Sequence, residues 1–341
     1  MPNVLINLMK ELNKKRIYEL DGLRGVAALA VVFYHYTTRF SIKFNNDIIS
    51  NVIEFNYGHY GVQLFFVISG FVIFMSIEKV KSPFEFLYKR FVRLYPTFWM
   101  SLFLTFFLLL LFGPDLIIPK YSQLLVNLTM VPKIFGFKAV DGVYWTLMVE
   151  LFFYLLIFIL LLIKKIKDIN KLSFLYLLFG FIFIVFNETL DGYNYFNTII
   201  MYYLHGLLFV MGIYFYKLWK YGNDMSLYFQ LLLILIISFL LGNFELGWVY
   251  SLIFIIFYFL INKKMIFLSF PIFIFFGKIS YTLYLIHQNI GHSIQVLLIN
   301  HNVNSVFILI AVPLGVTLLL SYIITFFFEK NIMRKLNSFY K

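Results

Sequence analysis

Long apolar runs separated by short polar segments follow one another along most of the 341-residue chain. A helix needs about 20 mainly apolar residues to cross the hydrocarbon core of a bilayer. By this measure, about ten runs can each form a spanning helix. They lie near residues 20–39, 60–77, 96–112, 144–163, 172–186, 198–217, 226–241, 247–261, 279–299 and 304–327. The pattern predicts an all-α polytopic membrane protein in which residues 1–341 form a single membrane domain.

The basic residues are concentrated in alternate connections between these runs. They cluster in segments 10–16, 79–93, 164–171, 217–220, 263–264 and 330–341, whereas the other connections hold few Lys or Arg. Cytoplasmic loops of membrane proteins are enriched in these residues. We therefore expect both termini to lie in the cytoplasm.

Composition supports this class and excludes others. Hydrophobic residues make up 62% of the chain and charged residues only 13%, whereas about a quarter of a soluble domain is charged. The formal charge of +12 comes from the loop clusters, so it indicates topology and not a nucleic-acid partner. The absence of Cys excludes disulfides and Cys-ligated metal. No P-loop, H-E-x-x-H or G-x-S-x-G motif occurs, so nucleotide hydrolysis, zinc proteolysis and α/β-hydrolase chemistry are unsupported.

Ionisable residues within the predicted spans are costly and therefore mark candidate functional sites. Arg24 and His35 share one face of the first predicted helix, roughly 16.5 Å apart along its axis. Arg24 is either a functional cation or an arginine that snorkels to the headgroups beside Asp21. His35 and Glu150 are expected at similar depths below the outer surface. If their helices are neighbours, the carboxylate could orient the imidazole to accept a proton, but a structural His–Glu pair fits the spacing equally well.

A polar stripe marks the ninth predicted span. Ser280, Tyr284 and His287 recur at helical spacing, so one polar face is expected to point into the bundle. His287 and His292 are five residues apart, which is a poor spacing for shared metal ligation. We expect no metal site.

A basic pair precedes the third predicted span. Arg90 and Arg93 lie at its cytoplasmic entry, next to Lys89. They either set the topology or form an anion site for phosphate groups.

Two other features have simpler explanations. His205 has no obvious partner along the chain, so a buried core histidine is the favoured interpretation. Ser69 and Gly70 place small residues in the second predicted span, which favours close helix packing over a chemical role.

Several short segments occur in a consistent order along nearly the whole chain. They are Leu-Asp-Gly-Leu-Arg-Gly at 20–25 followed by His35, and the segments 61–71, 89–96, 144–150, 209–212, 277–287 and 328–330. Together they resemble the acyltransferase-3 family of integral membrane acyltransferases, with Arg24 and His35 matching its Arg-x10-His signature. The segment 148–151 lacks the second acidic residue that many relatives carry after the glutamate.

The resemblance implies transfer of an acyl group, often acetyl, from cytoplasmic acyl-coenzyme A to a hydroxyl beyond the membrane. It assigns catalysis to His35 and donor contact to Arg24, and leaves open whether His35 is a general base or is itself acylated. From its expected depth beside His35, Glu150 is the predicted catalytic partner. With the basic pair at the third predicted span, the expected donor-binding residues are Arg24, Arg90 and Arg93. The expected substrate-binding residues, in the fourth and ninth predicted spans, are Trp145, Ser280, Tyr284 and His287.

We therefore expect a membrane O-acyltransferase in a bacterial cytoplasmic membrane, resembling stand-alone members without an extracytoplasmic hydrolase-like domain. Acetyl-coenzyme A is the expected donor, and a surface polysaccharide or lipid-linked sugar is the expected acceptor. No permanently bound cofactor is expected, and the expected partners are donor, acceptor and membrane lipid. A transporter that exports a lipid-linked or acylated sugar is the alternative, because buried charges can also line a substrate path.

Overall fold

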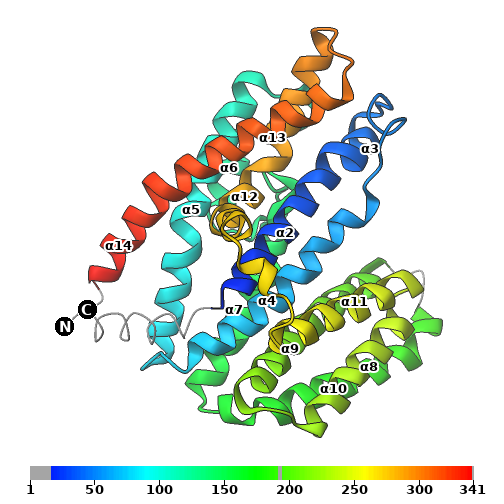
Figure 1. Ribbon diagram of the computed structural model, residues 1–341, viewed down its shortest axis with the longest axis vertical. Coiled ribbons are helices and arrows are strands. Elements are labelled where there is room, and N and C mark those ends of the chain that lie inside the picture. The colour runs from blue at the N-terminus through cyan, green and yellow to red at the C-terminus, as the bar shows by residue number, and fades with distance from the viewer. Residues whose placement is uncertain (1–16, 191–193, 340–341) are drawn as a thin grey trace.

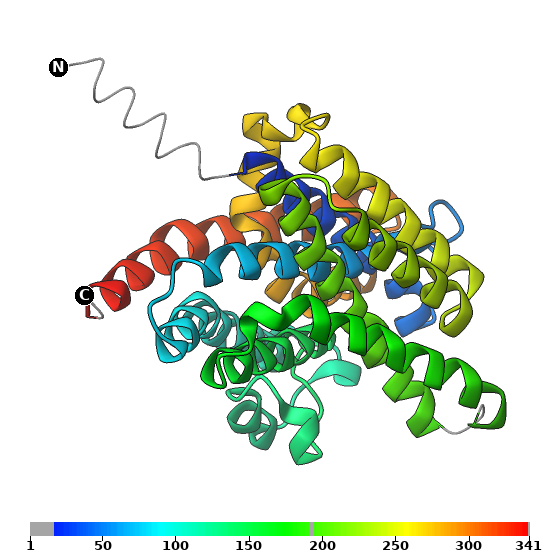
Figure 2. The ribbon, with the colours of Figure 1, turned by 90° about the horizontal axis from the view of Figure 1, so that it is seen from below.

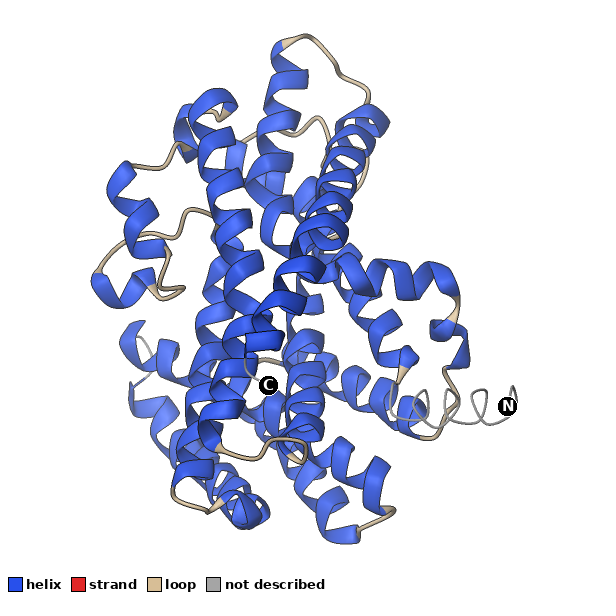
Figure 3. Ribbon diagram, turned by 90° about the vertical axis from the view of Figure 1, so that its left-hand side faces the viewer, coloured by secondary structure: helices blue, strands red, loops and turns tan. Residues whose placement is uncertain are grey.

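All regular structure in the described part of the chain is helical (Figure 3). The computed structural model describes residues 17–190 and 194–339. The long helices are α2 (Tyr18–Tyr34), α4 (Gly61–Ile77), α5 (Pro83–Phe112), α7 (Trp145–Leu162), α8 (Ile169–Leu190), α9 (Asn194–Tyr221), α10 (Met225–Leu241), α11 (Phe244–Ile261), α12 (Pro271–Asn300) and α13 (Val306–Ile323). The shorter helices are α3 (Phe40–Phe44), α6 (Tyr121–Asn127) and α14 (Lys330–Phe339), and π-helical turns occur at η1 (His35–Arg39) and η8 (Ile324–Glu329).

Each predicted apolar run overlaps a helix, but only seven helices of the described residues are long and apolar enough to cross a membrane. The predicted runs 20–39, 226–241 and 279–299 are not among them. The α-helical parts α2 and α10 have 17 residues each, and α12 carries a series of buried polar side chains. The structure therefore supports an all-helical membrane protein and confirms the predicted number of spans only in part. Two starting boundaries were also wrong, because α5 begins at Pro83 and continues through Pro96, and α12 begins at Pro271.

Close backbone contact between α2 and α12 forms the centre of the bundle. A Cβ atom on Gly277 would lie 1.9 Å from the carbonyl oxygen of Asp21, and one on Gly25 would lie 2.7 Å from the nitrogen of Gly277. Only residues without a side chain permit this approach. α12 also packs against α5 and α13, so most of its polar side chains face protein and not lipid.

A second close contact joins α4 to α9. A Cβ on Gly70 would lie 2.2 Å from the carbonyl oxygen of Phe209, and one on Gly212 would lie 2.1 Å from that of Val67. This confirms the prediction of close packing at Gly70. α8, α10 and α11 group with α9 on the lower right of Figure 1.

Contacts between helix ends show that several basic clusters lie at the same end of the bundle. Lys220, at the end of α9, forms an ion pair with Glu78, directly after α4. Lys217 donates a hydrogen bond of 2.5 Å to Asn170, at the start of α8. The clusters 79–93, 164–171 and 217–220 are therefore neighbours.

The C-terminal helix and the start of α2 belong to this same end. α14 lies beside the start of α5 (Figure 2), where the Tyr88 hydroxyl donates to the carbonyl oxygen of Leu336 at 2.8 Å. The turn η7 (Ile266–Ser269), which follows Lys264, packs against Gly22 in α2. This arrangement agrees with the predicted alternation of loops, whereas the basic segment 10–16 and Lys341 lie outside the described residues. Which end faces the cytoplasm stays a prediction.

Candidate active site

A cavity of about 460 Å³ lies between α2, α4, α5, α7, α12 and α14, at the end where the basic clusters gather. Arg24, Arg90 and Arg93, the residues predicted to bind the donor, all line it. An apolar wall comes from α4 through Val62, Phe65, Phe66, Val72 and Ile73, and α14 contributes Met333 and Asn337. The cavity thus combines several cations with an apolar surface.

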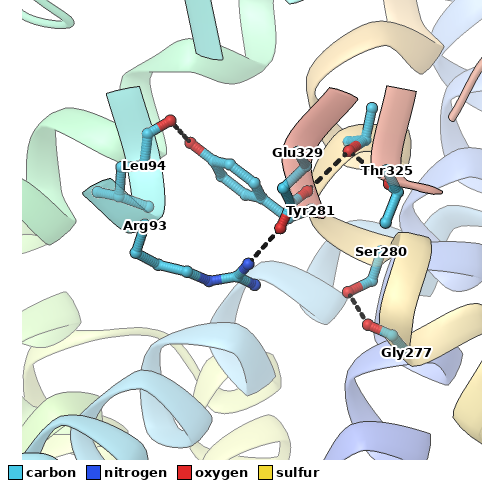
Figure 4. A network of polar contacts seen from close by, with 8 residues as sticks. Arg93, Leu94, Gly277, Ser280, Tyr281, Thr325 and Glu329 are labelled. Carbon is cyan, nitrogen blue, oxygen red and sulfur yellow. Dashed lines mark hydrogen bonds and ion pairs between the residues drawn. The ribbon is translucent and has the colours of Figure 1, made fainter. Parts of the chain in front are cut away.

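Arg93 is held by a carboxylate from the end of the membrane bundle. Its guanidinium donates to Glu329 at 2.5 Å (Figure 4), and Glu329 is buried within the π-helical turn η8. The guanidinium also lies 5.6 Å from the ring centre of Tyr281, whose hydroxyl donates to the carbonyl of Leu94. Because Glu329 balances its charge, Arg93 is a weaker site for an added anion than an unpaired arginine would be.

Lys89, also in the lining, pairs with Glu85 at 2.7 Å, whereas Arg24 and Arg90 are less fully neutralised. Arg24 makes no hydrogen bond or close ion pair within residues 17–190 and 194–339, although the charges of Arg93, Asp21 and Glu150 act on it. Arg90 donates to the Ser76 hydroxyl at 3.0 Å and lies over the rings of two aromatic residues. Guanidinium groups with free N–H donors are suited to phosphate oxygens. Arg24 and Arg90 therefore provide the available positive charge.

Glu150 lies in the cavity wall, and its hydrogen bonds go to neighbours other than His35. Its Oε1 accepts from the Ser69 hydroxyl and from the Tyr154 hydroxyl, both at 2.6 Å. α7 packs chiefly against α4, α5 and α9. The partner of Glu150 from another helix is therefore on α4, and not on α2 as the sequence suggested. The direct His35–Glu150 contact considered from the sequence is therefore absent.

His35 instead meets two histidines of α12. Its Nδ1 lies 2.8 Å from the carbonyl oxygen of Val31 and 3.2 Å from Nε2 of His287. Nε2 of His292 lies 2.9 Å from the backbone oxygen of His35. His287 and His292, whose spacing is unsuited to shared metal ligation, thus contact the same residue for another reason.

The π-helical turn that begins at His35 is fastened to α12. Gln295 donates a hydrogen bond to the carbonyl oxygen of Tyr36 at 2.8 Å, in parallel with the bond from His292 to His35. The Tyr36 hydroxyl in turn donates to the carbonyl oxygen of His287 at 2.9 Å. π-helical turns occur often at functional sites, where they re-aim side chains. Here the turn fixes the backbone that carries the His35 ring.

The residues predicted to bind substrate fall into two groups. Ser280 and Tyr284 line the cavity, whereas Trp145 and His287 do not. The Trp145 ring packs against the ring of His205, with centroids 5.3 Å apart. His205 is buried as predicted, but its Nδ1 has no hydrogen-bond partner in the described part of the chain.

Several contacts were missed by reasoning from the sequence. Tyr154 lies one helical turn after Glu150, a spacing that indicates such a hydrogen bond. Ser69, Gln295 and Glu329 reach their partners from distant segments, and no local signal identifies those pairs.

A comparison with known families agrees with this arrangement. The family model described as an acyltransferase domain matches residues 17–326, which include the cavity arginines, Glu150 and the three histidines around His35. The chain belongs to the acyltransferase-3 family. Family membership makes it an enzyme that transfers an acyl group, with a donor and an acceptor as its substrates.

One curated relative of this acyltransferase is similar over most of both chains. It is a protein of Acidianus two-tailed virus named "Putative acetyltransferase ORF330". The two are 26% identical over 282 residues, which cover 78% of this chain and 80% of the viral protein. No solved structure matches the chain.

Proposed function

We propose that this membrane acyltransferase moves an acetyl group from cytoplasmic acetyl-coenzyme A to a hydroxyl of an extracytoplasmic or lipid-linked sugar of a surface polysaccharide. The observation that carries the proposal is the cavity, because it gathers the available charge of Arg24 and Arg90 at the basic end of the bundle. An anionic donor approaching from the cytoplasm would meet that charge first. The name of the viral relative agrees with acetyl as the transferred group.

The donor is expected to bind with its phosphates at the mouth of the cavity and its pantetheine arm along the α4 wall. Arg24 and Arg90 would bind phosphate oxygens through guanidinium N–H groups. Arg93, neutralised by Glu329, would mainly hold α5 against the end of the bundle. Oε2 of Glu150 makes no hydrogen bond with a described residue, so it is free to accept one from an amide of the donor arm. We therefore propose that Glu150 aligns the donor arm and does not contact His35.

The reacting centre is expected near His35. Along α2 this residue lies roughly 16.5 Å beyond Arg24, a span suited to an extended donor arm whose phosphates stay at the mouth. Tyr284 lines the cavity and its hydroxyl lies 2.9 Å from that of Thr146. One turn later on the same helix, His287 contacts His35. The polar stripe of α12 thus connects the cavity to the histidine.

His35 acts in this scheme as a general base. Its unprotonated ring nitrogen accepts the proton of the sugar hydroxyl while that oxygen attacks the thioester carbonyl. The carbon–sulfur bond then breaks, and the proton passes from His35 to the departing thiolate. The products are an O-acetyl ester and coenzyme A, and no proton is gained or lost overall.

The test uses membranes that contain the endogenous surface glycan, radiolabelled acetyl-coenzyme A and matched histidine variants. General-base assistance is worth about 10²–10⁴-fold in rate, so His35→Ala should reduce transfer to glycan by that factor without weakening coenzyme A binding. The buried histidine variant His205→Ala is the control and should retain transfer. A well-inserted His35→Ala protein that transfers acetyl at the parental rate would refute the mechanism. Label that stays on the denatured parental protein and is absent from His35→Ala would instead identify an acylated His35.

A further inference from the structure

The hydrogen bonds around His287 determine which of its ring nitrogens carries hydrogen. Its Nδ1 lies 2.9 Å from the carbonyl oxygen of Tyr284 and 3.1 Å from that of Leu283. Carbonyl oxygens only accept hydrogen bonds, so Nδ1 must be the donor. In the neutral ring, Nε2 is then an acceptor without hydrogen.

The same reasoning assigns the hydrogen of His35. Its Nδ1 lies between two acceptors, the carbonyl oxygen of Val31 at 2.8 Å and Nε2 of His287 at 3.2 Å. A bare nitrogen at this position would face two other lone pairs, so Nδ1 of His35 carries the hydrogen and shares it between them. Nε2 of His35 is therefore the nitrogen with a free lone pair, and it has no hydrogen-bond partner within the described residues.

Several titratable groups surround His35. Its titratable neighbours are His287 and His292 on α12, Tyr34 and Arg39 on its own helix, and His59, which contacts Tyr34 from the turn η2 (Asn56–Tyr60). None of these is a carboxylate. A carboxylate commonly fixes the tautomer of a catalytic histidine, so another group must do so here.

We propose that His287 is the positioning residue that holds His35 as the Nδ1–H tautomer and fixes the orientation of its ring. This inference rests on the proposed role of His35 and replaces the substrate-binding role expected for His287 from the sequence. Val31 alone could accept the same hydrogen, but it belongs to the helix that carries His35. His287 reaches the His35 ring from α12. The orientation of that ring therefore depends on the position of a helix that lines the cavity.

Removal and partial replacement of the acceptor should have different effects. His287→Leu deletes the acceptor, and we expect kcat to fall at least tenfold while the affinity for coenzyme A stays within twofold. Gln places an amide oxygen near the former Nε2, so His287→Gln should recover most of the lost rate. Asn is one methylene shorter than Gln and cannot reach His35, so the kcat of His287→Asn should stay close to that of His287→Leu. His205→Leu, which changes a buried histidine outside this contact, should leave kcat unchanged.

A spectroscopic measurement separates positioning from a general structural role. The chain has six His, so the nitrogen signals of His35 in ¹⁵N-histidine-labelled protein can be identified as those missing from His35→Ala. We expect the Nδ1–H form in the parent and in His287→Gln, and a mixture of tautomers in His287→Asn.

The outcomes distinguish this inference from the proposed function. Equal rates and an unchanged His35 tautomer in His287→Gln and His287→Asn would overturn the positioning role, even if His287→Leu failed to fold. Loss of activity in His35→Ala would in that case still support His35 as the base. Full activity in His35→Ala would instead refute the proposed mechanism, in which His35 is the base.

Discussion

Adding one methyl group at the contact between α4 and α9 tests how the cavity wall is held. In Gly212→Ala, the new Cβ would lie 2.1 Å from the carbonyl oxygen of Val67 and 2.7 Å from the backbone nitrogen of Phe71. Both obstacles are backbone atoms, so no side chain can rotate away. Contacts become ordinary at 3.4 Å, so the helices would have to separate by roughly 1.3 Å.

The magnitude follows from two opposing effects. Overpacking of this kind costs up to about 3 kcal/mol, and replacing Gly by Ala within a helix recovers about 1 kcal/mol. The expected net loss is about 2 kcal/mol, which corresponds to a melting temperature lower by about 4 °C for a large chain. Gly315 in α13 is the matched control, because a Cβ there meets no atom within 4 Å. Gly315→Ala should gain up to about 1 kcal/mol.

The assay is thermal unfolding of the purified protein in detergent, followed by the loss of the monodisperse peak in size-exclusion chromatography. Coenzyme A binding by Gly212→Ala should also weaken, because α4 supplies much of the cavity wall. A melting temperature for Gly212→Ala that equals or exceeds that of Gly315→Ala would show that the two helices are not in backbone contact at this position.

Two further predictions concern the loops. Burial raises the pKa of Asp141, just before α7, to about 6; since folding favours its protonated form, stability should fall as the pH rises from about 4 to about 6. Melting curves of the parent and of Asp141→Asn across this range check this, and an equal pH dependence of the two proteins would contradict it. The chain has no Cys, so Lys133→Cys and Lys167→Cys can report topology with a membrane-impermeant maleimide. Labelling in intact cells is expected at position 133 alone, and labelling at 167 would reverse the predicted orientation.

The positions and type of the helices could be predicted from the sequence because they depend on local patterns. Apolar runs of sufficient length located every long helix, and the spacing of Ser280, Tyr284 and His287 indicated the inward face of α12, where all three are buried. The small residue Gly70 indicated a close helix contact. These features depend on residues within a few turns of one another, so periodicity alone reveals them.

The partners of the site residues were decided only by the tertiary structure. Depth in the membrane suggested His35 beside Glu150, but depth does not determine which helices are neighbours. Close approach at Gly25 and Gly277 brings α12 against α2, which gives His35 a histidine partner, while α4 gives Glu150 its partner Ser69. Helix neighbours are set by the sum of many backbone and side-chain contacts between segments far apart in the chain. No spacing within one helix contains that information.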